Sequence, residues 1–264
     1  MRFIGTLLVL AFVAGVSFTS GGIVEDMEAA QAVYATRNNY VVAKAAFEKL
    51  IQDYPGGDVH TLARAQLFIG YSLVSSGAAG AKAAYDKVGK DYPTIREGAL
   101  IEAQLRSGAT LGNTEAAMAA FVKTAADFPA ASANNSAKIQ LYIGRNLYAR
   151  RKFIEAQVVL VTSITASGEN VLVDKQVLAV QQHLVGMCLV KQQKLIDASK
   201  ALLAVTQFGD TGALRRGVDP YAVLMSGADY EEYLARCLRI IHAIPENKII
   251  LERVKSQWLA VRGE

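Results

Sequence analysis

The chain of 264 residues contains little cysteine, little proline and little excess charge. Two cysteines are too few for a disulfide scaffold, and five prolines with no glycine period exclude a collagen-like fibre. A hydrophobic content of 52% with 20% charged residues excludes wholesale disorder. The net charge of +4 is too small for a dedicated nucleic-acid binder. We therefore expect a globular protein that needs no metal staple and has no nucleic-acid partner.

Sequence motifs of catalysis are also missing. The three histidines, His60, His183 and His242, are far apart and lack metal-ligand spacing. Cys188 and Cys237 form no C-x-x-C pair, and the chain has no G-x-S-x-G, Walker or G-x-G-x-x-G motif. The sequence therefore predicts a protein that is not an enzyme and holds no cofactor or metal.

The N-terminus reads as an export signal or a membrane anchor. Residues 3–18 form an uncharged apolar run that follows Arg2 and precedes Glu25, Asp26 and Glu28. This charge order predicts a cytoplasmic N-terminus with the rest of the chain outside. As a helix the run reaches only about 24 Å, which favours a signal, while the lack of an A-x-A cleavage site favours an anchor. Both interpretations of residues 1–22 stay open.

A short frame recurs along the rest of the chain. It consists of an aromatic residue, six further residues, a second aromatic and a proline, and an alanine stands four residues before it. An alanine at that place lets a neighbouring helix approach, and the aromatic side chain fills the adjacent gap. The three frames are 47–55, 85–93 and 121–129, and Ala43, Ala81 and Ala117 precede them. Two weaker copies begin at Phe153 and Leu195. They have Leu160 and Leu202 in place of the leading aromatic, with Ala156 and Ala198 four residues earlier.

Glycines recur at an equivalent position in the helices that precede these frames. Gly70 lies 15 residues before Tyr85, and Gly144 and Gly186 each lie 16 residues before a leucine. Glycine inside a helix costs about 1 kcal/mol relative to alanine. Its recurrence therefore predicts close helix crossings. The third repeat has Leu105 at this place, so its register is the least regular.

This order of glycine, alanine, aromatic and proline resembles the tetratricopeptide repeat, or TPR. Gly144, Leu147, Ala156 and Leu160 follow the pattern most closely. Units of 36 to 41 residues with aromatic-proline ends further resemble a bacterial envelope subgroup, which includes the TolA-binding cell-division coordinator and the outer-membrane-assembly lipoprotein.

The resemblance implies an all-α fold, a right-handed superhelical solenoid of antiparallel helix pairs. Residues 23–208 would form about five repeats, followed by a loop over 209–228 and a capping helix pair over 229–264. The expected repeats are 24–55, 59–93, 95–129, 135–168 and 173–208.

The resemblance also implies a binding groove lined by the first helix of each repeat. Groove-facing positions are three residues before, one after and four after the recurring glycine. They are Leu67, Tyr71 and Val74, Leu141, Arg145 and Tyr148, His183, Met187 and Val190, and in the third repeat Glu102 and Arg106. Because Tyr and Arg often anchor interfaces, the candidate site is Tyr71, Arg106, Arg145, Tyr148 and His183. The loop pair Arg215 and Arg216 is a further candidate.

Two functions remain open at this point. The first is a non-catalytic scaffold in the bacterial periplasm, secreted or tethered to the inner membrane, that binds a partner protein or peptide in the groove. The alternative is a membrane-anchored structural subunit of a larger envelope complex, such as a secretion, motor or assembly machine. A permanent subunit is expected to expose a large apolar patch when isolated.

Overall fold

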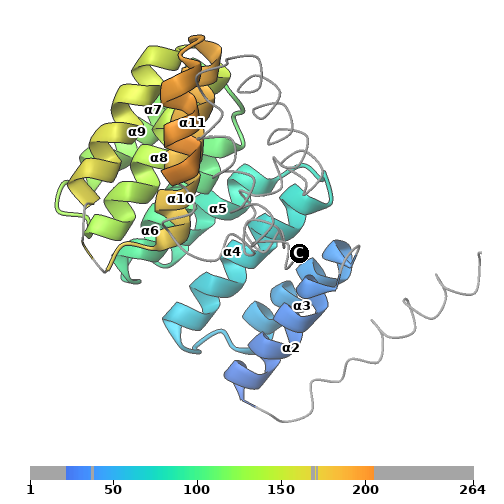
Figure 1. Ribbon diagram of the computed structural model, residues 1–264. Helices are drawn as coiled ribbons and strands as arrows, with labels where there is room; N and C mark the ends of the chain where they lie inside the picture. The colour runs from blue at the N-terminus through green and yellow to red at the C-terminus, as the bar shows by residue number, and fades with distance from the viewer. Residues whose placement is uncertain (1–21, 37–38, 168–169, 171, 205–264) are drawn as a thin grey trace, which may run out of the picture. The chain divides into compact units, whose positions relative to one another are not determined.

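The structure is a computed structural model that describes residues 22–36, 39–167, 170 and 172–204 (Figure 1). Within these residues the regular structure is entirely helical. The expected signal or anchor in residues 1–21, the loop 209–228 with Arg215 and Arg216, and the capping pair 229–264 lie outside the described residues.

The described helices belong to two compact units that divide between Gly112 and Asn113. In the first unit each helix packs against the next one, and the first helices of successive repeats, α2, α4 and α6, also contact one another. This is the packing expected of stacked helix pairs. The helices are α2 (Ile23–Ala35), α3 (Tyr40–Asp53), α4 (Val59–Ser75), α5 (Ala81–Asp91) and α6 (Glu97–Ala109).

The second unit repeats this arrangement. Consecutive helices again pack together, and the first helices α8 and α10 contact each other. The boundary between the units falls between the two helices that the sequence assigns to the third repeat. The helices of the second unit are α7 (Glu115–Asp127), α8 (Ala133–Ala149), α9 (Phe153–Ser167), α10 (Lys175–Lys191) and α11 (Leu195–Ala204).

The recurring small and aromatic residues form the helix contacts that the sequence predicts. All five frame alanines are buried, and so are the leading aromatics Phe47, Tyr85 and Phe121. A Cβ atom on Gly70 would lie 2.3 Å from Cε1 of Tyr85, and one on Gly144 would lie 2.6 Å from Cδ2 of Leu160. The all-α, TPR-like fold class is therefore confirmed, and the glycines mark close helix crossings.

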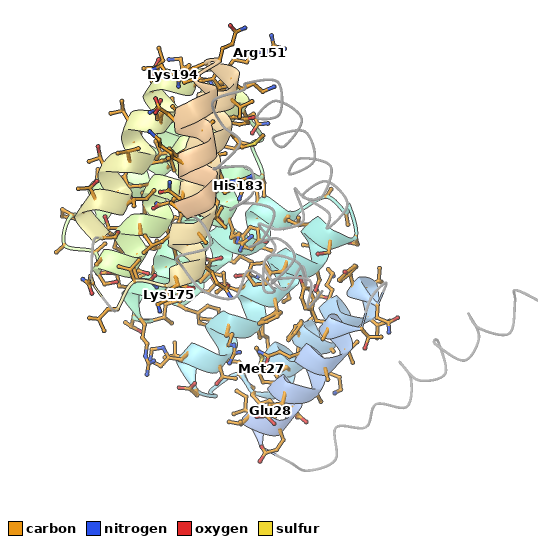
Figure 2. All side chains as sticks on the ribbon, in the orientation of Figure 1. Met27, Glu28, Arg151, Lys175, His183 and Lys194 are labelled. Carbon is orange, nitrogen blue, oxygen red and sulfur yellow. The ribbon has the colours of Figure 1, made fainter. Side chains whose placement is uncertain are left out.

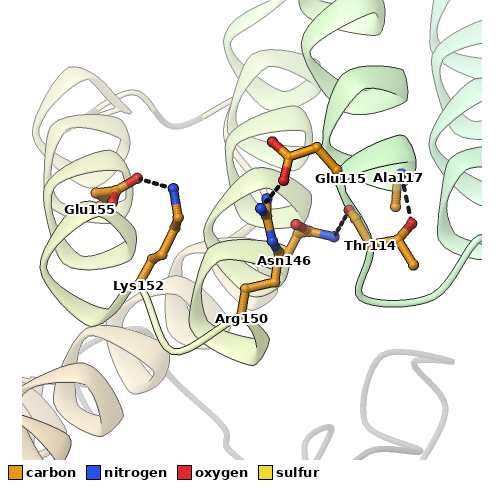
Figure 3. Close-up of polar contacts among 7 residues, drawn as sticks. All are labelled: Thr114, Glu115, Ala117, Asn146, Arg150, Lys152 and Glu155. Atoms are coloured by element: carbon orange, nitrogen blue, oxygen red, sulfur yellow. Dashed lines mark hydrogen bonds and ion pairs between the residues drawn. The ribbon is translucent and has the colours of Figure 1, made fainter.

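Side chains from the start of α7 and from the C-terminal end of α8 hold α7 in the second unit (Figure 3). Oγ1 of Thr114 caps α7 by accepting a hydrogen bond from the N–H of Ala117 at 3.2 Å. Nδ2 of Asn146 on α8 donates to the backbone carbonyl of Thr114 at 3.3 Å. Arg150, just after α8, forms an ion pair with Glu115. The C-terminal turn of α8 therefore holds the N-terminus of α7.

The turns that end the first helices contain a left-handed residue in each repeat from α4 onward. It is a glycine after α4 and α6, with φ of 67° at Gly77 and 71° at Gly112. After α8 and α10 it is Arg151, with φ of 62°, and Gln193, with φ of 61°. These two turns lie at the same end of the second unit, where Arg151 and Lys194 are labelled in Figure 2. Two turns thus hold a side chain in a conformation that favours glycine.

We expect Arg151→Gly to raise the free energy of unfolding by about 0.5 to 1 kcal/mol, because glycine removes the clash of Cβ with the backbone at positive φ. Gly77→Ala should have the opposite sign, since it introduces that clash where no other atom crowds the site. Urea denaturation followed by circular dichroism measures both changes. A loss of stability in Arg151→Gly would contradict the prediction.

Candidate partner-binding site

Three of the side chains that the repeat register places on the groove meet in the first unit. Oη of Tyr71 on α4 donates a hydrogen bond to Oε1 of Glu102 on α6 at 3.3 Å. Nε of Arg106, one helical turn further along α6, donates to the same oxygen at 2.7 Å. The Arg106 guanidinium also lies over the Tyr71 ring, 5.1 Å from its centroid. Glu102 thus joins the two residues that the sequence selects as anchors.

The charged side chains of this cluster are largely buried. The Arg106 and Glu102 side chains are only 14% and 16% exposed, so water screens their ion pair less than a surface pair. Burial raises the pKa of Tyr71, and the neighbouring Glu102 carboxylate raises it further, while Arg106 opposes this. Tyr71 therefore keeps its proton across the physiological range and stays a hydrogen-bond donor to Glu102.

A row of aromatic rings continues from this cluster toward α2. The Phe68 ring lies 5.4 Å from the Tyr71 ring and 5.2 Å from the Tyr34 ring, both in edge-on geometry. All three rings are partly exposed. We call Tyr34, Phe68, Tyr71, Glu102 and Arg106 the aromatic row. It runs over α2, α4 and α6 and combines rigid apolar area with a fixed charged end, the chemistry that anchors protein interfaces.

The other described candidates, Arg145, Tyr148 and His183, lie in the second unit on α8 and α10. Tyr148 packs against Phe153 with 5.4 Å between ring centroids and borders the small core around Cys188. Burial raises its pKa. Cys188 is a buried free thiol, and burial raises its pKa to about 12. The candidate residues are thus divided between two units, and Tyr148 contributes to packing as well as to the surface.

His183, labelled on α10 in Figure 2, is the one candidate among the described residues whose pKa is lowered. Burial lowers its pKa to about 4 from an ordinary 6.5. Between these values the unfolded chain binds a proton that the folded chain does not, so stability falls as the pH drops from about 6.5 toward 4.

We expect the free energy of unfolding to be lower at pH 5 than at pH 7 by on the order of 1 kcal/mol from this histidine alone. His183→Gln should remove that part of the pH dependence. Urea denaturation of both proteins at the two pH values measures it. An unchanged difference between pH 7 and pH 5 in the variant would contradict the assignment.

Two of the groove positions are wrong. The residues three before the glycine, Leu67 and Leu141, are buried in the cores of their units rather than facing a groove. The reason is that both leucines pack into the apolar cores of their units, where burial of apolar area stabilises the fold. By contrast, Val74, four residues after Gly70, is exposed.

Sequence reasoning missed a hydrogen bond that recurs within the helix pairs. Nε2 of Gln66 donates to the carbonyl of Ala84 at 3.0 Å, and Nε2 of Gln182 donates to the carbonyl of Ala201 at 3.0 Å. Each glutamine lies four residues before the recurring glycine, and Gln140 occupies the same place before Gly144. The recurrence of glutamine four residues before the glycine was the sequence signal that could have predicted this hydrogen bond. Tyr34 and Phe68 were missed because the contact between their rings joins two repeats, which no local spacing shows.

Comparisons with known proteins show the fold class of this chain. Two crystal structures of a kinesin light chain-like protein of Podosopora anserina with nearly identical TPR-like repeats are similar to this chain. The first, of a variant with a single substitution, has a TM-score of 0.53 at 14% sequence identity, and the match covers 70% of this chain and 93% of that one. The second structure has a TM-score of 0.52 at 14% identity, with 70% and 94% covered. The chain therefore has a TPR-like helical repeat fold. No protein-family model and no curated protein matches it.

Two further searches concern the described residues alone. None of their helices combines the length and the apolar character needed to cross a lipid bilayer. Among the same residues, no three His, Cys, Asp or Glu side chains come together in a way that would hold a metal ion.

Proposed function

We propose that the protein is a non-catalytic scaffold that binds a partner protein or peptide on the face formed by its first helices. The observation that carries this proposal is the aromatic row. It places partly exposed rings and a fixed Glu102–Arg106 pair on three successive first helices. The helical repeat fold supplies the stacked surface on which such a row is continuous.

The chemistry of the row favours a protein ligand. Its rings offer flat apolar area at low entropic cost, which suits aliphatic or proline side chains of an extended segment. Glu102 neutralises Arg106, so the row lacks the surplus positive charge that a nucleic acid requires.

A photo-crosslinking amino acid tests which face binds. Placed at Val74, an exposed position on the first helix α4, it should form an adduct with the partner in living cells. The control is Val41, an exposed valine on the second helix α3 of the same unit. Mass spectrometry identifies the adducts. Equal adducts from both positions, or adducts from Val41 alone, would overturn the proposed face.

We also propose that the scaffold works outside the cytoplasm, in the periplasm of a bacterium. The support is the charge order around residues 3–18 and the aromatic-proline repeat ends that resemble envelope proteins. Cell fractionation combined with mass spectrometry of the N-terminal peptide tests it. A processed chain in the periplasm, or an intact chain in the membrane with a protease-accessible body, agrees with the proposal. An intact chain in the cytoplasm contradicts it.

Mass spectrometry of the proteins that co-purify from the same fractions distinguishes a scaffold from a permanent subunit of an envelope complex. A scaffold should purify with partners below stoichiometric amounts, whereas a permanent subunit should bring stoichiometric partners with residues 3–18 still attached.

A further inference from the structure

The turns that end the first helices differ in charge between the two units. In the first unit, residues 76–80 after α4 and 110–112 after α6 include no charged side chain. In the second unit, residues 150–152 after α8 read Arg-Arg-Lys, and residues 191–194 at the end of α10 read Lys-Gln-Gln-Lys. Positive charge therefore gathers on the turns of one unit alone.

The two charged turns lie at one end of the second unit. Figure 2 shows Arg151 from the first turn and Lys194 from the second at that end. Side chains also connect the turns through α9, because Nε2 of Gln192 donates a hydrogen bond to Oε1 of Gln157 at 2.8 Å. Gln157 lies in the first two turns of α9, shortly after the Arg-Arg-Lys sequence. The cations of both turns thus belong to one surface.

Two of these cations have carboxylate partners. Arg150 forms an ion pair with Glu115 at the start of α7, and Lys152 lies 3.4 Å from a carboxylate oxygen of Glu155. The Lys152 and Glu155 side chains are 45% and 58% exposed, so water screens that pair strongly. Arg150 is only 20% exposed and serves the contact between α7 and α8.

The other three cations are exposed and form no ion pair within the part of the chain that the structure describes. They are Arg151, Lys191 and Lys194. One further exposed carboxylate, Asp197, lies in the first turn of α11 beside them. Three cations against one carboxylate leave a surplus of positive charge at this end. We call Arg151, Lys191 and Lys194 the basic end.

The backbone supplies a second observation. Arg151 has a φ of 62°, a conformation that Gly77 and Gly112 adopt in the turns of the first unit. A glycine would be more stable there, as the expected effect of Arg151→Gly states. A charged side chain held at a cost in stability is typical of a surface that serves function.

We propose that the basic end binds the anionic headgroups of a phospholipid bilayer. The cations lie on neighbouring turns at the end of a helix stack, where several of them meet a flat surface together. Each Lys or Arg near an anionic bilayer strengthens binding by about fivefold. The electrostatic attraction needs no apolar groove and leaves the side chains solvated.

The sequence favours a bilayer over other polyanions. The apolar run 3–18 is short for a membrane span, and stable membrane attachment takes two signals, such as one apolar chain with a polybasic patch. A nucleic acid would require more positive charge than the +4 of the whole chain. This inference goes beyond the proposed function, because the aromatic row lies on the other unit and stays available to a partner protein.

Vesicle partitioning of the full-length chain tests the proposal. The measured quantity is the ratio of its partition coefficients on vesicles of phosphatidylcholine with and without phosphatidylglycerol, at about 0.1 M salt, where the Debye length is about 10 Å. Arg151→Gly/Lys194→Gln should lower this ratio at least about tenfold. Because Arg151→Gly is expected to stabilise the fold, unfolding would not explain the loss.

The matched control removes two positive charges elsewhere in the same unit. Lys175 is exposed at the start of α10, about 24 Å of helix from Lys191, and is labelled at the opposite end in Figure 2. Lys138 is partly exposed in the first turns of α8. Lys138→Gln/Lys175→Gln should change the ratio less than about twofold. An equal loss in both double variants, or no loss in either, would overturn the proposal.

A second readout covers the case in which residues 1–22 hold every variant on both kinds of vesicle. An environment-sensitive fluorescent amino acid at the exposed Gln193 should shift its emission on phosphatidylglycerol vesicles and not on phosphatidylcholine alone. The same probe at Lys175 should shift on neither. Absence of the shift at Gln193 would contradict bilayer binding. If soluble polyglutamate shifts the Gln193 probe and anionic vesicles do not, the basic end binds an acidic protein segment and the bilayer proposal is wrong.

Discussion

Glu102→Ala should lower the free energy of unfolding by about 2 to 3 kcal/mol, the largest loss that we expect from a single surface-facing side chain. The substitution removes the acceptor for the Tyr71 hydroxyl and the counter-charge of Arg106 together. Arg106 is only 14% exposed, so water cannot fully replace the lost carboxylate. Urea denaturation followed by circular dichroism measures the change.

The control for this prediction is an exposed ion pair of the same unit. Lys87 and Asp91 lie 3.4 Å apart on α5, and both side chains are more than one third exposed. Asp91→Ala should change the free energy of unfolding by less than about 0.5 kcal/mol. Glu102→Gln should fall between the two, because it keeps an acceptor for Tyr71 and removes only the charge. If Glu102→Ala is no more harmful than Asp91→Ala, the cluster is not a structural unit.

Gly70→Ala should destabilise the protein by about 1 to 3 kcal/mol, although alanine is the better helix former. The new Cβ would lie within 2.7 Å of three atoms of the Tyr85 ring. Tyr85 is almost fully buried and contacts the Tyr71 ring, so the ring has little room to retreat. The helix crossing must therefore open, which also shifts the aromatic row.

Alanine substitutions at two other glycines serve as comparisons for Gly70→Ala. Gly144→Ala should also destabilise the protein, because its new Cβ would lie 2.6 Å from Cγ and Cδ2 of Leu160, which is fully buried. Gly89→Ala on α5 should stabilise the protein by about 0.5 to 1 kcal/mol, since nothing lies within 4 Å and alanine restricts the unfolded chain. Thermal or urea unfolding of the three variants tests the order. A stabilised Gly70→Ala would contradict the close crossing.

These two predictions concern neighbouring parts of one surface. Tyr71 follows Gly70 directly, and its ring contacts both the Tyr85 ring and the Arg106 guanidinium. Loss of the crossing at Gly70 should therefore reduce partner adducts from the crosslinker at Val74, whereas Gly89→Ala should not. This comparison separates damage to the binding face from a general loss of stability.

The repeat frame was enough to predict the helix pairs. Residues such as Ala43, Phe47 and Gly70 lie at fixed spacings because each must meet one neighbour a short distance along the chain. Local contacts of this kind leave a period in the sequence, and the period predicts the fold class. The same period assigned Tyr71 and Arg106 to first helices of successive repeats, where the structure joins them through Glu102.

Three features were decided by the tertiary structure. Leu67 and Leu141 occupy groove positions in the repeat register but are buried. The register alone does not show where the buried side of a first helix ends and its exposed side begins. The hydrogen bond from Tyr71 to Glu102 joins side chains 31 residues apart, a contact that no local spacing encodes. The apolar character of α9 is visible in the sequence, but only packing shows that Ile154, Val158 and Val161 stay exposed.

The sequence by itself thus determined the helical repeat, its close crossings and which residues belong to the first helices. The tertiary structure alone decided which candidate anchors touch, which apolar residues are buried, and which apolar residues stay exposed. The physical reason is that periodic patterns record contacts within a repeat, whereas burial and pairing between repeats depend on how neighbouring helices stack.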